Sequence, residues 1–120
     1  MKIGILLGDD IGLEVVPVCV NVMQAAAEKT GLNIQWMPLP IGRKAHEEFG
    51  HTLPKVTLDG LRDIDGWILG PIGHAAYPKN EPGWGGMPPL RKMFDLFANI
   101  KPVLSYDNIP SIHKEVDIIF

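Results

Sequence analysis

Disulfide chemistry is the first thing that this sequence lacks. It holds a single cysteine, Cys19, so no internal disulfide is available to stabilise the fold. The chain must depend on a hydrophobic core, and 120 residues of which 46% are hydrophobic supply enough apolar surface for one. Scarce cysteine is typical of proteins from a reducing compartment, and we expect this one to be cytoplasmic.

Long apolar runs and basic clusters are also missing. The apolar segment at residues 3–7 is far shorter than the ~20 apolar residues of a membrane span, and no signal-peptide cleavage pattern follows it. The 11 lysine and arginine residues form no long run, and the net charge is −3. These features argue against a membrane or a nucleic acid as the main partner.

Familiar site signatures are absent too. The four histidines, His46, His51, His74 and His113, have no metal-ligand spacing. The turn at residues 8–12 has glycine only at its first and last positions, so it is not the G-x-G-x-x-G fingerprint of dinucleotide-binding folds. Function must therefore be sought in other patterns.

What is present is an alternation of strand-like and helix-like segments. Short apolar runs predict strands at residues 3–7, 33–39, 66–69, 100–106 and 116–120. Besides a first helix before Gly31, short helices are predicted at 43–49, after Pro54 and at 90–97. The Gly/Pro-rich residues 70–89 predict a long loop, and loops of this length are often functional.

The first helix is predicted from an apolar stripe with three- and four-residue spacing. Its members are Val15, Val18, Cys19, Val22, Met23 and Ala26. We expect this stripe, Cys19 included, to pack into the core, and Gly31 to end the helix. In the helix after Pro54, the residues expected to face the core are Val56, Leu58 and Leu61.

This alternation predicts an α/β fold with a largely parallel sheet and flanking helices. Ligands of such sheets bind beyond the carboxyl ends of the strands, where the turn at 8–12 and the loop after residue 69 both fall. The apolar run at 116–120 resembles an interior strand. We therefore expect the fold to be incomplete at the C-terminus, or its edge to be covered by a partner.

Three segments are candidates for chemistry, and each has a plainer interpretation. The turn at 8–12 either brings backbone N–H groups toward an anion or is only a tight turn. Residues 70–74 either let a planar ring approach the backbone or are only a strand exit. Arg91 and Lys101 either aim two cations at one carboxylate pocket or belong to a solvated basic face on which Arg91 pairs with Asp95.

In combination these segments resemble the isocitrate/isopropylmalate (and tartrate) dehydrogenase family. Residues 8–15, GDDIGLEV, look like the family's opening G-D-G-I-G-P-E-V, and residues 65–73, DGWILGPIG, are similar to its D-A-x-L-L-G-x-x-G. Residues 90–102, LRKMFDLFANIKP, are close to L-R-K-x-x-D-L-F-A-N-L-R-P. The blocks occur in order over nearly the whole chain, which indicates the N-terminal portion of such a protein.

The resemblance implies an activity and a set of binding residues. The family oxidises a 2-hydroxy acid that carries a 3-carboxylate, using NAD or NADP and Mg or Mn, and then removes CO₂. Arg91 matches an arginine that binds substrate carboxylate, and Lys101 occupies the position of a second arginine. The residues that match the cofactor site are Ile11, Gly70, Pro71, Ile72 and Gly73.

Three departures from the family pattern bear on the substrate. Asp10 stands where the family has glycine, and Leu13 where it has proline. Lys101 replaces an arginine and so loses a bidentate fork. Residues 77–84 do not match the isopropylmalate branch and lie nearer the tartrate-like and broad-specificity members. Isopropylmalate, tartrate or malate, and isocitrate are therefore all candidate substrates.

The family's catalytic groups are expected outside this chain. Its general-base lysine, catalytic tyrosine, metal-binding aspartates and adenine-binding loop match nothing here, so we predict no catalytic or metal-binding residue and an inactive isolated chain. Residues 1–100 are expected to form part of the large domain, and 101–120 to begin the central, small-domain strands. The resemblance implies a homodimer for the full-length protein. The alternatives are a catalytically incomplete module that binds a dicarboxylate or nucleotide, and an α/β domain without a ligand.

Overall fold

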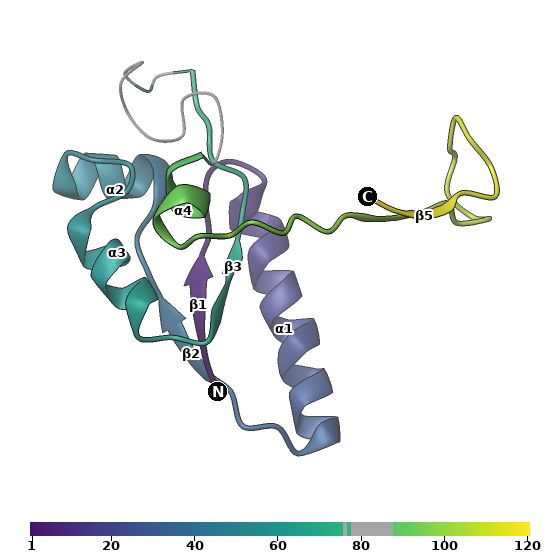
Figure 1. Cartoon of the computed structure of the whole chain (residues 1–120), viewed down its shortest axis with the longest axis horizontal. Helices are drawn as coiled ribbons and strands as arrows, with labels where there is room; N and C mark the ends of the chain where they lie inside the picture. The colour runs from purple at the N-terminus through teal and green to yellow at the C-terminus, as the bar shows by residue number, and fades with distance from the viewer. Residues whose placement is uncertain (76, 78–87) are drawn as a thin grey trace. The chain divides into compact units, whose positions relative to one another are not determined.

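The computed structural model describes residues 1–75, 77 and 88–120, and for Pro88 only the backbone. Two compact units make up the chain, Met1–Met87 and Pro88–Phe120. The first unit is a small sheet with helices on both of its faces (Figure 1). Among the described residues, no helix is both long and apolar enough to cross a membrane.

The sheet of the first unit has three parallel strands. They are β1 (Lys2–Leu6), β2 (Gln35–Pro38) and β3 (Gly66–Leu69), in the order β2-β1-β3. Ile3 of the central strand lies beside Trp36 on one side and Gly66 on the other. The predicted parallel sheet is thus confirmed. β1 is apolar from Ile3 onward because both of its faces are covered.

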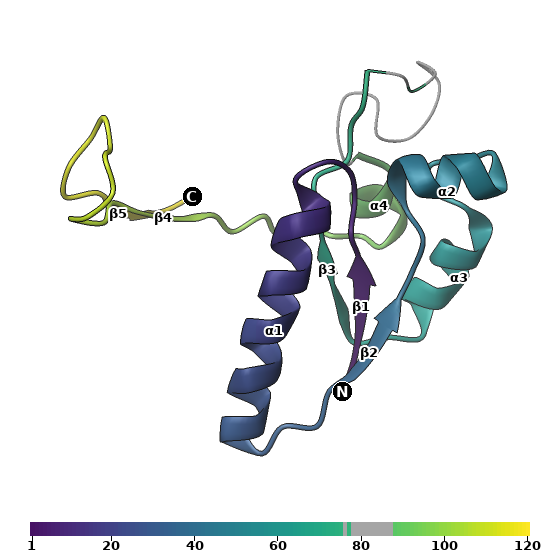
Figure 2. The ribbon, with the colours of Figure 1, turned by 180° about the vertical axis from the view of Figure 1, so that it is seen from behind.

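Helices connect these strands over opposite faces of the sheet. α1 (Gly12–Thr30) joins β1 to β2, and α2 (Gly42–Phe49) with α3 (Lys55–Arg62) joins β2 to β3. The two crossovers run in opposite directions along the sheet. Because parallel crossovers are right-handed, α1 must cover one face while α2 and α3 cover the other. Figures 1 and 2 show this arrangement from the front and from behind.

α1 ends where the sequence predicts, but it turns a different side to the sheet. Gly31 adopts a left-handed backbone, with φ of 73°, and closes the helix. The predicted core stripe is wrong, because Val15, Val18 and Val22 are 48%, 60% and 64% exposed, and Cys19 is also exposed. Ala26 is exposed as well, and Met23 is the one member of the stripe that is half-buried; the other buried or half-buried residues of α1 are Gly12, Val16, Val20, Gln24 and Ala27.

α2 and α3 pack on the other face of the sheet. α2 matches the predicted helix at 43–49 to within one residue, and Leu61 of α3 is buried as predicted. Val56 is 51% exposed, contrary to the prediction, and Thr57 is the buried residue beside it. The Thr57 hydroxyl donates a hydrogen bond to the Pro40 carbonyl oxygen, so its burial leaves no unpaired polar group.

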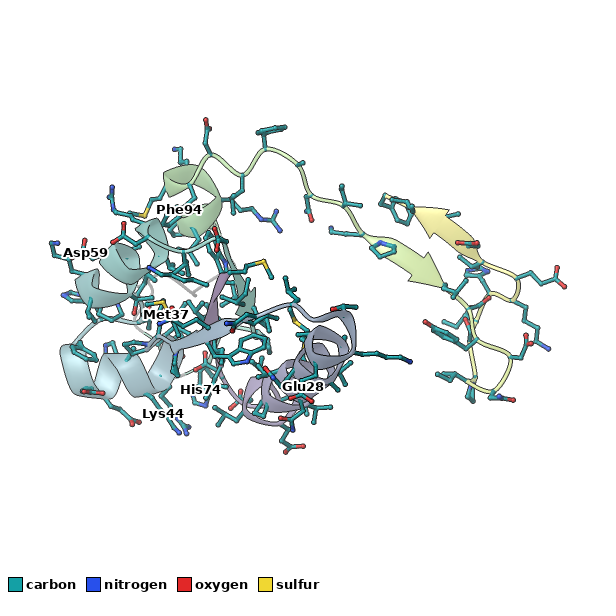
Figure 3. All side chains as sticks on the ribbon, turned by 90° about the horizontal axis from the view of Figure 1, so that it is seen from below. Glu28, Met37, Lys44, Asp59, His74 and Phe94 are labelled. Carbon is teal, nitrogen blue, oxygen red and sulfur yellow. The ribbon has the colours of Figure 1, made fainter. Side chains whose placement is uncertain are left out.

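The core of the first unit lies between the sheet and the two helix layers. Its buried apolar residues include Ile3, Leu6, Val16, Ala27, Ile41, Ala45 and Leu61. In Figure 3, Met37 of β2 lies among the interior side chains, whereas Lys44 on α2 and Asp59 on α3 lie at the outer surface. This scaffold holds the carboxyl ends of β1 and β3 beside each other.

The second unit begins with the short helix α4 (Pro88–Met93), which differs from the predicted helix at 90–97. It ends early because Asp95 has a left-handed backbone with φ of 55°, and the Leu96 N–H donates to the Arg91 carbonyl oxygen at 2.8 Å. This is the hydrogen bond of a Schellman helix end. Of the predicted loop at 70–89, residues 76 and 78–87 lie outside the described residues.

A two-stranded antiparallel ribbon follows in the second unit. β4 (Pro102–Leu104) pairs with β5 (Asp117–Ile119), and Val103 lies opposite Ile118. Both strands were predicted, and both are shorter than the apolar runs that indicated them. The predicted domain boundary after residue 100 stays a prediction.

Candidate functional site

The turn after β1 and the loop after β3 are in direct contact at the carboxyl edge of the sheet. The Asp9 N–H donates to the Pro71 carbonyl oxygen at 2.7 Å. Glycines permit this approach, since a methyl group at Gly8 would lie 2.2 Å from the Pro71 oxygen. A methyl group at Gly70 would lie 1.9 Å from the Leu7 oxygen. The two segments are therefore held together by backbone contacts that leave no space for side chains at these positions.

The N-terminus of α1 is occupied by its own turn. The Gly12 N–H donates to the Asp9 carbonyl oxygen at 2.8 Å, and the Leu13 N–H donates to that of Asp10 at 3.1 Å. A phosphate bound at this helix end would have to break these bonds. The turn at 8–12 is therefore tight, its Gly12 and Leu13 N–H groups are paired within it, and Asp10 lies in the left-handed region at φ of 44°.

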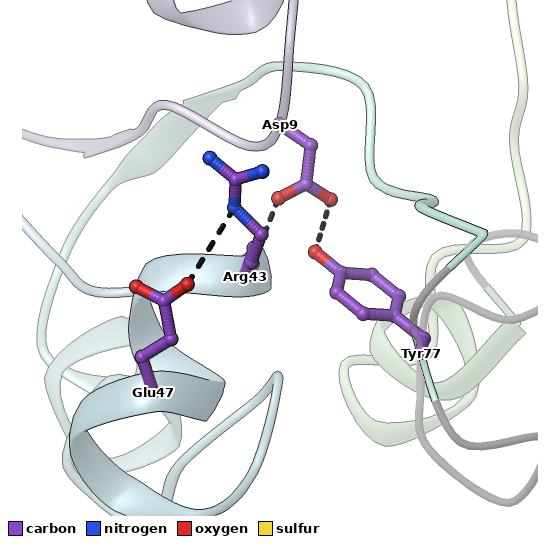
Figure 4. A network of polar contacts seen from close by, with 4 residues as sticks. All are labelled: Asp9, Arg43, Glu47 and Tyr77. Carbon is purple, nitrogen blue, oxygen red and sulfur yellow. Dashed lines mark hydrogen bonds and ion pairs between the residues drawn. The ribbon is translucent and has the colours of Figure 1, made fainter.

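The side chain of Asp9 joins three segments of the first unit (Figure 4). Its Oδ1 accepts a hydrogen bond from the Arg43 backbone N–H at 2.8 Å. Its Oδ2 accepts one from the Gly73 N–H at 3.0 Å and another from the Tyr77 hydroxyl. Asp9 is only 5% exposed, and these three donors offset the cost of burying its carboxylate.

The contact with Arg43 also caps α2. Ile41, the residue before the helix, offers no side-chain acceptor. The Gly42 N–H donates to the Thr52 carbonyl oxygen at 2.8 Å, and the Arg43 N–H donates to Asp9. A carboxylate at this end of a helix interacts favourably with the helix dipole, by about 0.3–1 kcal/mol. Asp9 thereby performs, from a distant part of the chain, the role of a capping side chain.

Tyr77 is the most perturbed titratable group of the site. It is 5% exposed, and burial raises the pKa of its hydroxyl well above the ordinary value; the hydrogen bond to Asp9 and the negative charge there raise it further. The hydroxyl therefore stays neutral, which is the form that donates to a carboxylate. The Tyr77 ring lies 6.0 Å from the His74 ring, tilted by 53°.

The predicted cofactor residues line the meeting point of the turn and the loop. Ile11 is 55% exposed, in the turn whose Asp9 contacts Pro71. Pro71 and Gly73 are exposed, Ile72 is half-buried, and Gly70 is buried. Aliphatic side chains, a proline and a glycine backbone are groups that suit a flat ring better than a phosphate. The cofactor role of these residues stays a prediction.

The predicted substrate residues lie in the second unit. Arg91 is in the last turn of α4, Lys101 lies directly before β4, and both side chains are exposed. The Lys101 backbone pairs with Phe120 through two hydrogen bonds of 2.9 and 3.0 Å. Asp95 lies beyond the end of α4, so it does not share a helix face with Arg91. That Arg91 and Lys101 bind a carboxylate stays a prediction.

Sequence reasoning did not single out Asp9 or Tyr77. A signal for Asp9 was available, because it is an acidic residue directly after a buried strand, at the edge of the sheet where ligands bind. Among the described residues, Asp9 is the one charged side chain that is buried. Tyr77 gave no such signal, since its contact joins residues 68 positions apart.

A metal centre is not formed by the part of the chain that the structure describes. No three His, Cys, Asp or Glu side chains are grouped there so as to hold a metal ion. That the metal ligands lie outside this chain stays a prediction.

Known proteins resemble this chain over nearly its whole length. A family model described as isocitrate/isopropylmalate dehydrogenase matches residues 2–119. The 3-isopropylmalate dehydrogenase of Moorella thermoacetica is 35% identical over an alignment of 112 residues, which covers 90% of this chain and 31% of that protein. The 3-isopropylmalate dehydrogenase of Halalkalibacterium halodurans is 37% identical over an alignment of 111 residues, which also covers 90% of this chain and 31% of that protein.

Solved structures give the same picture. The crystal structure of isocitrate dehydrogenase from Methylococcus capsulatus matches with a TM-score of 0.77 and 30% identity, covering 98% of this chain and 33% of that one. The TT0538 protein from Thermus thermophilus matches with a TM-score of 0.73 and 25% identity, over 98% and 23% of the two chains. The chain thus spans about a third of the length of the curated relatives it matches, whose shares are 31–34% among those named first.

Proposed function

The chain belongs to the isocitrate/isopropylmalate dehydrogenase family, and we propose that it is the N-terminal part of an oxidoreductase that oxidises and decarboxylates a 3-carboxy-2-hydroxy acid with NAD or NADP. The candidate acids are isopropylmalate, tartrate or malate, and isocitrate. Because the chain spans 31% of a relative such as the Moorella protein, the activity of a whole enzyme remains a proposal.

One observation supports this proposal most directly. The turn that carries Ile11 and the loop at 70–73 come from separate motifs, and they lie in contact through the Asp9–Pro71 hydrogen bond. They meet at the carboxyl edge of a parallel sheet, where α/β proteins bind nucleotides. The two motifs that resemble the family's cofactor site are therefore also in contact in the structure.

The chemistry divides between bound groups and the chain. When bound, NAD or NADP supplies the hydride acceptor, and Mg or Mn supplies the charge that stabilises the product of CO₂ loss. This chain contributes binding and orientation. We assign Ile11 and the loop at 70–73 to the cofactor, and Arg91 and Lys101 to the substrate carboxylate. Arg91 offers a bidentate fork, whereas Lys101 offers a flexible point charge.

The proposal extends to partners and location. A small hydroxy-dicarboxylate is the substrate, and the full-length protein is a homodimer, as the resemblance implies. The cytoplasmic location predicted from the scarcity of cysteine belongs to the same proposal.

Calorimetric titration of the chain with malate, tartrate and NAD⁺ tests the assignment. We expect weak binding of a dicarboxylate, weakened about tenfold in Arg91→Ala because a charge-assisted hydrogen bond is lost. Lys92→Ala is the matched control, since it removes the next exposed cation of the same helix and should leave affinity unchanged. The assignment fails if the wild-type chain gives no heat with any of these ligands, or if the two variants weaken binding equally.

The incomplete length favours a second candidate, a catalytically incomplete module that binds a dicarboxylate or nucleotide without turning it over. The two candidates share the same binding site and differ in the length of the native polypeptide. A longer native polypeptide that contains this chain supports the dehydrogenase, whereas a native product of 13.2 kDa supports the module.

A further inference from the structure

Asp9 binds the loop after β3 at two points. Its backbone N–H donates to the Pro71 carbonyl oxygen at 2.7 Å, and its carboxylate accepts from the Gly73 N–H at 3.0 Å. One residue of the turn therefore holds the residues on both sides of Ile72. Two attachments this close together define the path of the loop backbone as well as its distance from β1.

The same carboxylate extends this connection to two further segments. Tyr77 donates its hydroxyl to Oδ2, and the Arg43 N–H donates to Oδ1. Gly42 packs closely against the carboxylate, since a methyl group there would lie 2.4 Å from Oδ1. Any displacement of the carboxylate must therefore move the loop, Tyr77 or the start of α2.

We propose that Asp9, together with Tyr77, is a positioning residue that fixes the loop at 70–73 in the arrangement that receives the nucleotide cofactor. The cofactor part of this inference rests on the proposed function, whereas the ordering of the loop does not. Asp9 and Tyr77 are each 5% exposed, so both act through the loop backbone instead of touching the ligand.

Asp9→Asn tests this at constant size. An amide has one acceptor oxygen, while its NH₂ group is a donor. If the amide oxygen faces Gly73 and Tyr77, the NH₂ group faces the Arg43 N–H, and two donors then meet. If the amide group is rotated by half a turn, the Gly73 N–H and the Tyr77 hydroxyl lose their acceptor. Tyr77→Phe removes one donor and leaves the carboxylate, so it should have a smaller effect in the same direction.

A glycine pair provides a second route to the same result. Gly42→Ala places a methyl group against Asp9 Oδ1, whereas Gly50→Ala has nothing within 4 Å. The two glycines have nearly equal φ, 77° and 76°, so Gly50→Ala controls for placing an alanine at positive φ. If the loop at 70–73 loses order in Gly42→Ala and not in Gly50→Ala, displacement of the Asp9 carboxylate is the cause.

The experiment is amide hydrogen exchange by NMR on the full 120-residue chain. We expect Gly73 exchange to accelerate about tenfold or more in Asp9→Asn, by less in Tyr77→Phe, and not at all in Asp10→Asn, which removes an exposed neighbouring charge. Leu61→Ala controls for general loss of stability, because it opens the core. It should accelerate exchange throughout the first unit and leave Gly73 no faster than its neighbours.

Two results would overturn the inference: unchanged Gly73 exchange in both Asp9→Asn and Gly42→Ala, or acceleration that matches the uniform pattern of Leu61→Ala. Titration of the same proteins with NAD⁺ separates this outcome from the proposed function. If the wild-type chain binds NAD⁺, Asp9→Asn should bind it at least tenfold more weakly. If the wild-type chain binds none while Gly73 is selectively loosened in Asp9→Asn, the positioning role stands and the cofactor assignment fails.

Discussion

Gly8 and Gly31 have the same φ, 73° at each, but they differ in their surroundings. A methyl group at Gly8 would lie 2.2 Å from the Pro71 carbonyl oxygen, whereas one at Gly31 would meet nothing within 4 Å. The pair therefore separates two uses of glycine. Gly31 provides a left-handed helix end, and Gly8 also lets the turn after β1 contact the loop after β3.

This difference gives a prediction for stability. Gly31→Ala should lower the free energy of unfolding by about 1 kcal/mol, the penalty for alanine in the left-handed region. Gly8→Ala should lower it by about 1–3 kcal/mol more, because the added methyl group overlaps backbone atoms. Urea denaturation of the two variants measures the difference. Equal losses of unfolding free energy would contradict the prediction, because they would show that the turn and the loop can move apart at little cost.

Tyr77 makes stability depend on alkaline pH. Its pKa is raised in the folded chain by burial and by Asp9, whereas in the unfolded chain it is about 10. Between these values the unfolded state releases a proton that the folded state keeps, so rising pH favours unfolding. The stabilisation from Tyr77 is complete below about pH 10 and declines above it.

Urea midpoints measured from pH 8.5 to pH 11, spanning the ordinary tyrosine pKa of about 10, check this sign. We expect the alkaline decline to be shallower in Tyr77→Phe than in the wild-type chain. Tyr106→Phe, which removes the other of the two tyrosines at a position that is 60% exposed, should keep the wild-type slope. A Tyr77→Phe slope equal to the wild-type slope would contradict the assigned pKa direction.

Among the elements, α1 shows how far a sequence pattern reaches. Its presence and its end at Gly31 followed from periodicity and a glycine signal. Its orientation did not, because the helix carries apolar residues on more than one side. The predicted stripe through Val15, Val18 and Val22 is exposed, while Val16 and Ala27 are buried. Periodicity locates a stripe, but only packing against the sheet decides which of two stripes is inside.

Two valines of α1 test this orientation. Val16→Ala should lower the free energy of unfolding by about 2 kcal/mol, because Val16 is 3% exposed and its loss leaves a cavity. Val18→Ala, at a position 60% exposed, should change it by no more than about 0.5 kcal/mol. Thermal or urea unfolding distinguishes the two. A larger loss for Val18→Ala would mean that the outer stripe packs against something.

The other elements show the same division. The strand at Gly66–Leu69 was predicted to the residue, because a short apolar run between an acidic turn and a glycine has few alternatives. α4 ends four residues before the predicted Phe97, because Asp95 has a left-handed backbone conformation. An aspartate can also continue a helix, so the residue type did not reveal this end. The local sequence pattern therefore predicted the elements and their order, while the backbone conformation of single residues determined where they end.

For the whole molecule, the length of the chain determines which parts of a catalytic site it can supply. The chain spans about a third of its relatives, and no metal centre is formed by the residues that the structure describes. The sequence predicted the family and the segments of the site from three motifs. It did not predict the Asp9 network, because that network joins residues 34 to 68 positions apart whose contacts leave no local pattern.

We therefore predict that the isolated chain produces no NADH from isopropylmalate, isocitrate, malate or tartrate in the presence of Mn²⁺. The reason is that the family's proton-transfer and metal-binding groups match nothing in these 120 residues. Absorbance at the NADH band measures turnover, with Arg91→Ala as the control for contaminating activity. Turnover that disappears in Arg91→Ala would prove this prediction wrong.

The strand order also has a consequence for how the chain folds. Of the three strands of this sheet, the central one is synthesised before its two neighbours, which pair later, Gln35 beside Lys2 and Gly66 beside Ile3. Closing the second pairing spans roughly twice as many residues, which adds about 0.6 kcal/mol of loop-closure entropy. We expect β1, α1 and β2 to associate first, with β3 joining afterwards. The hydrogen bonds from Gly73 and Tyr77 to Asp9 then form only when this assembly is complete.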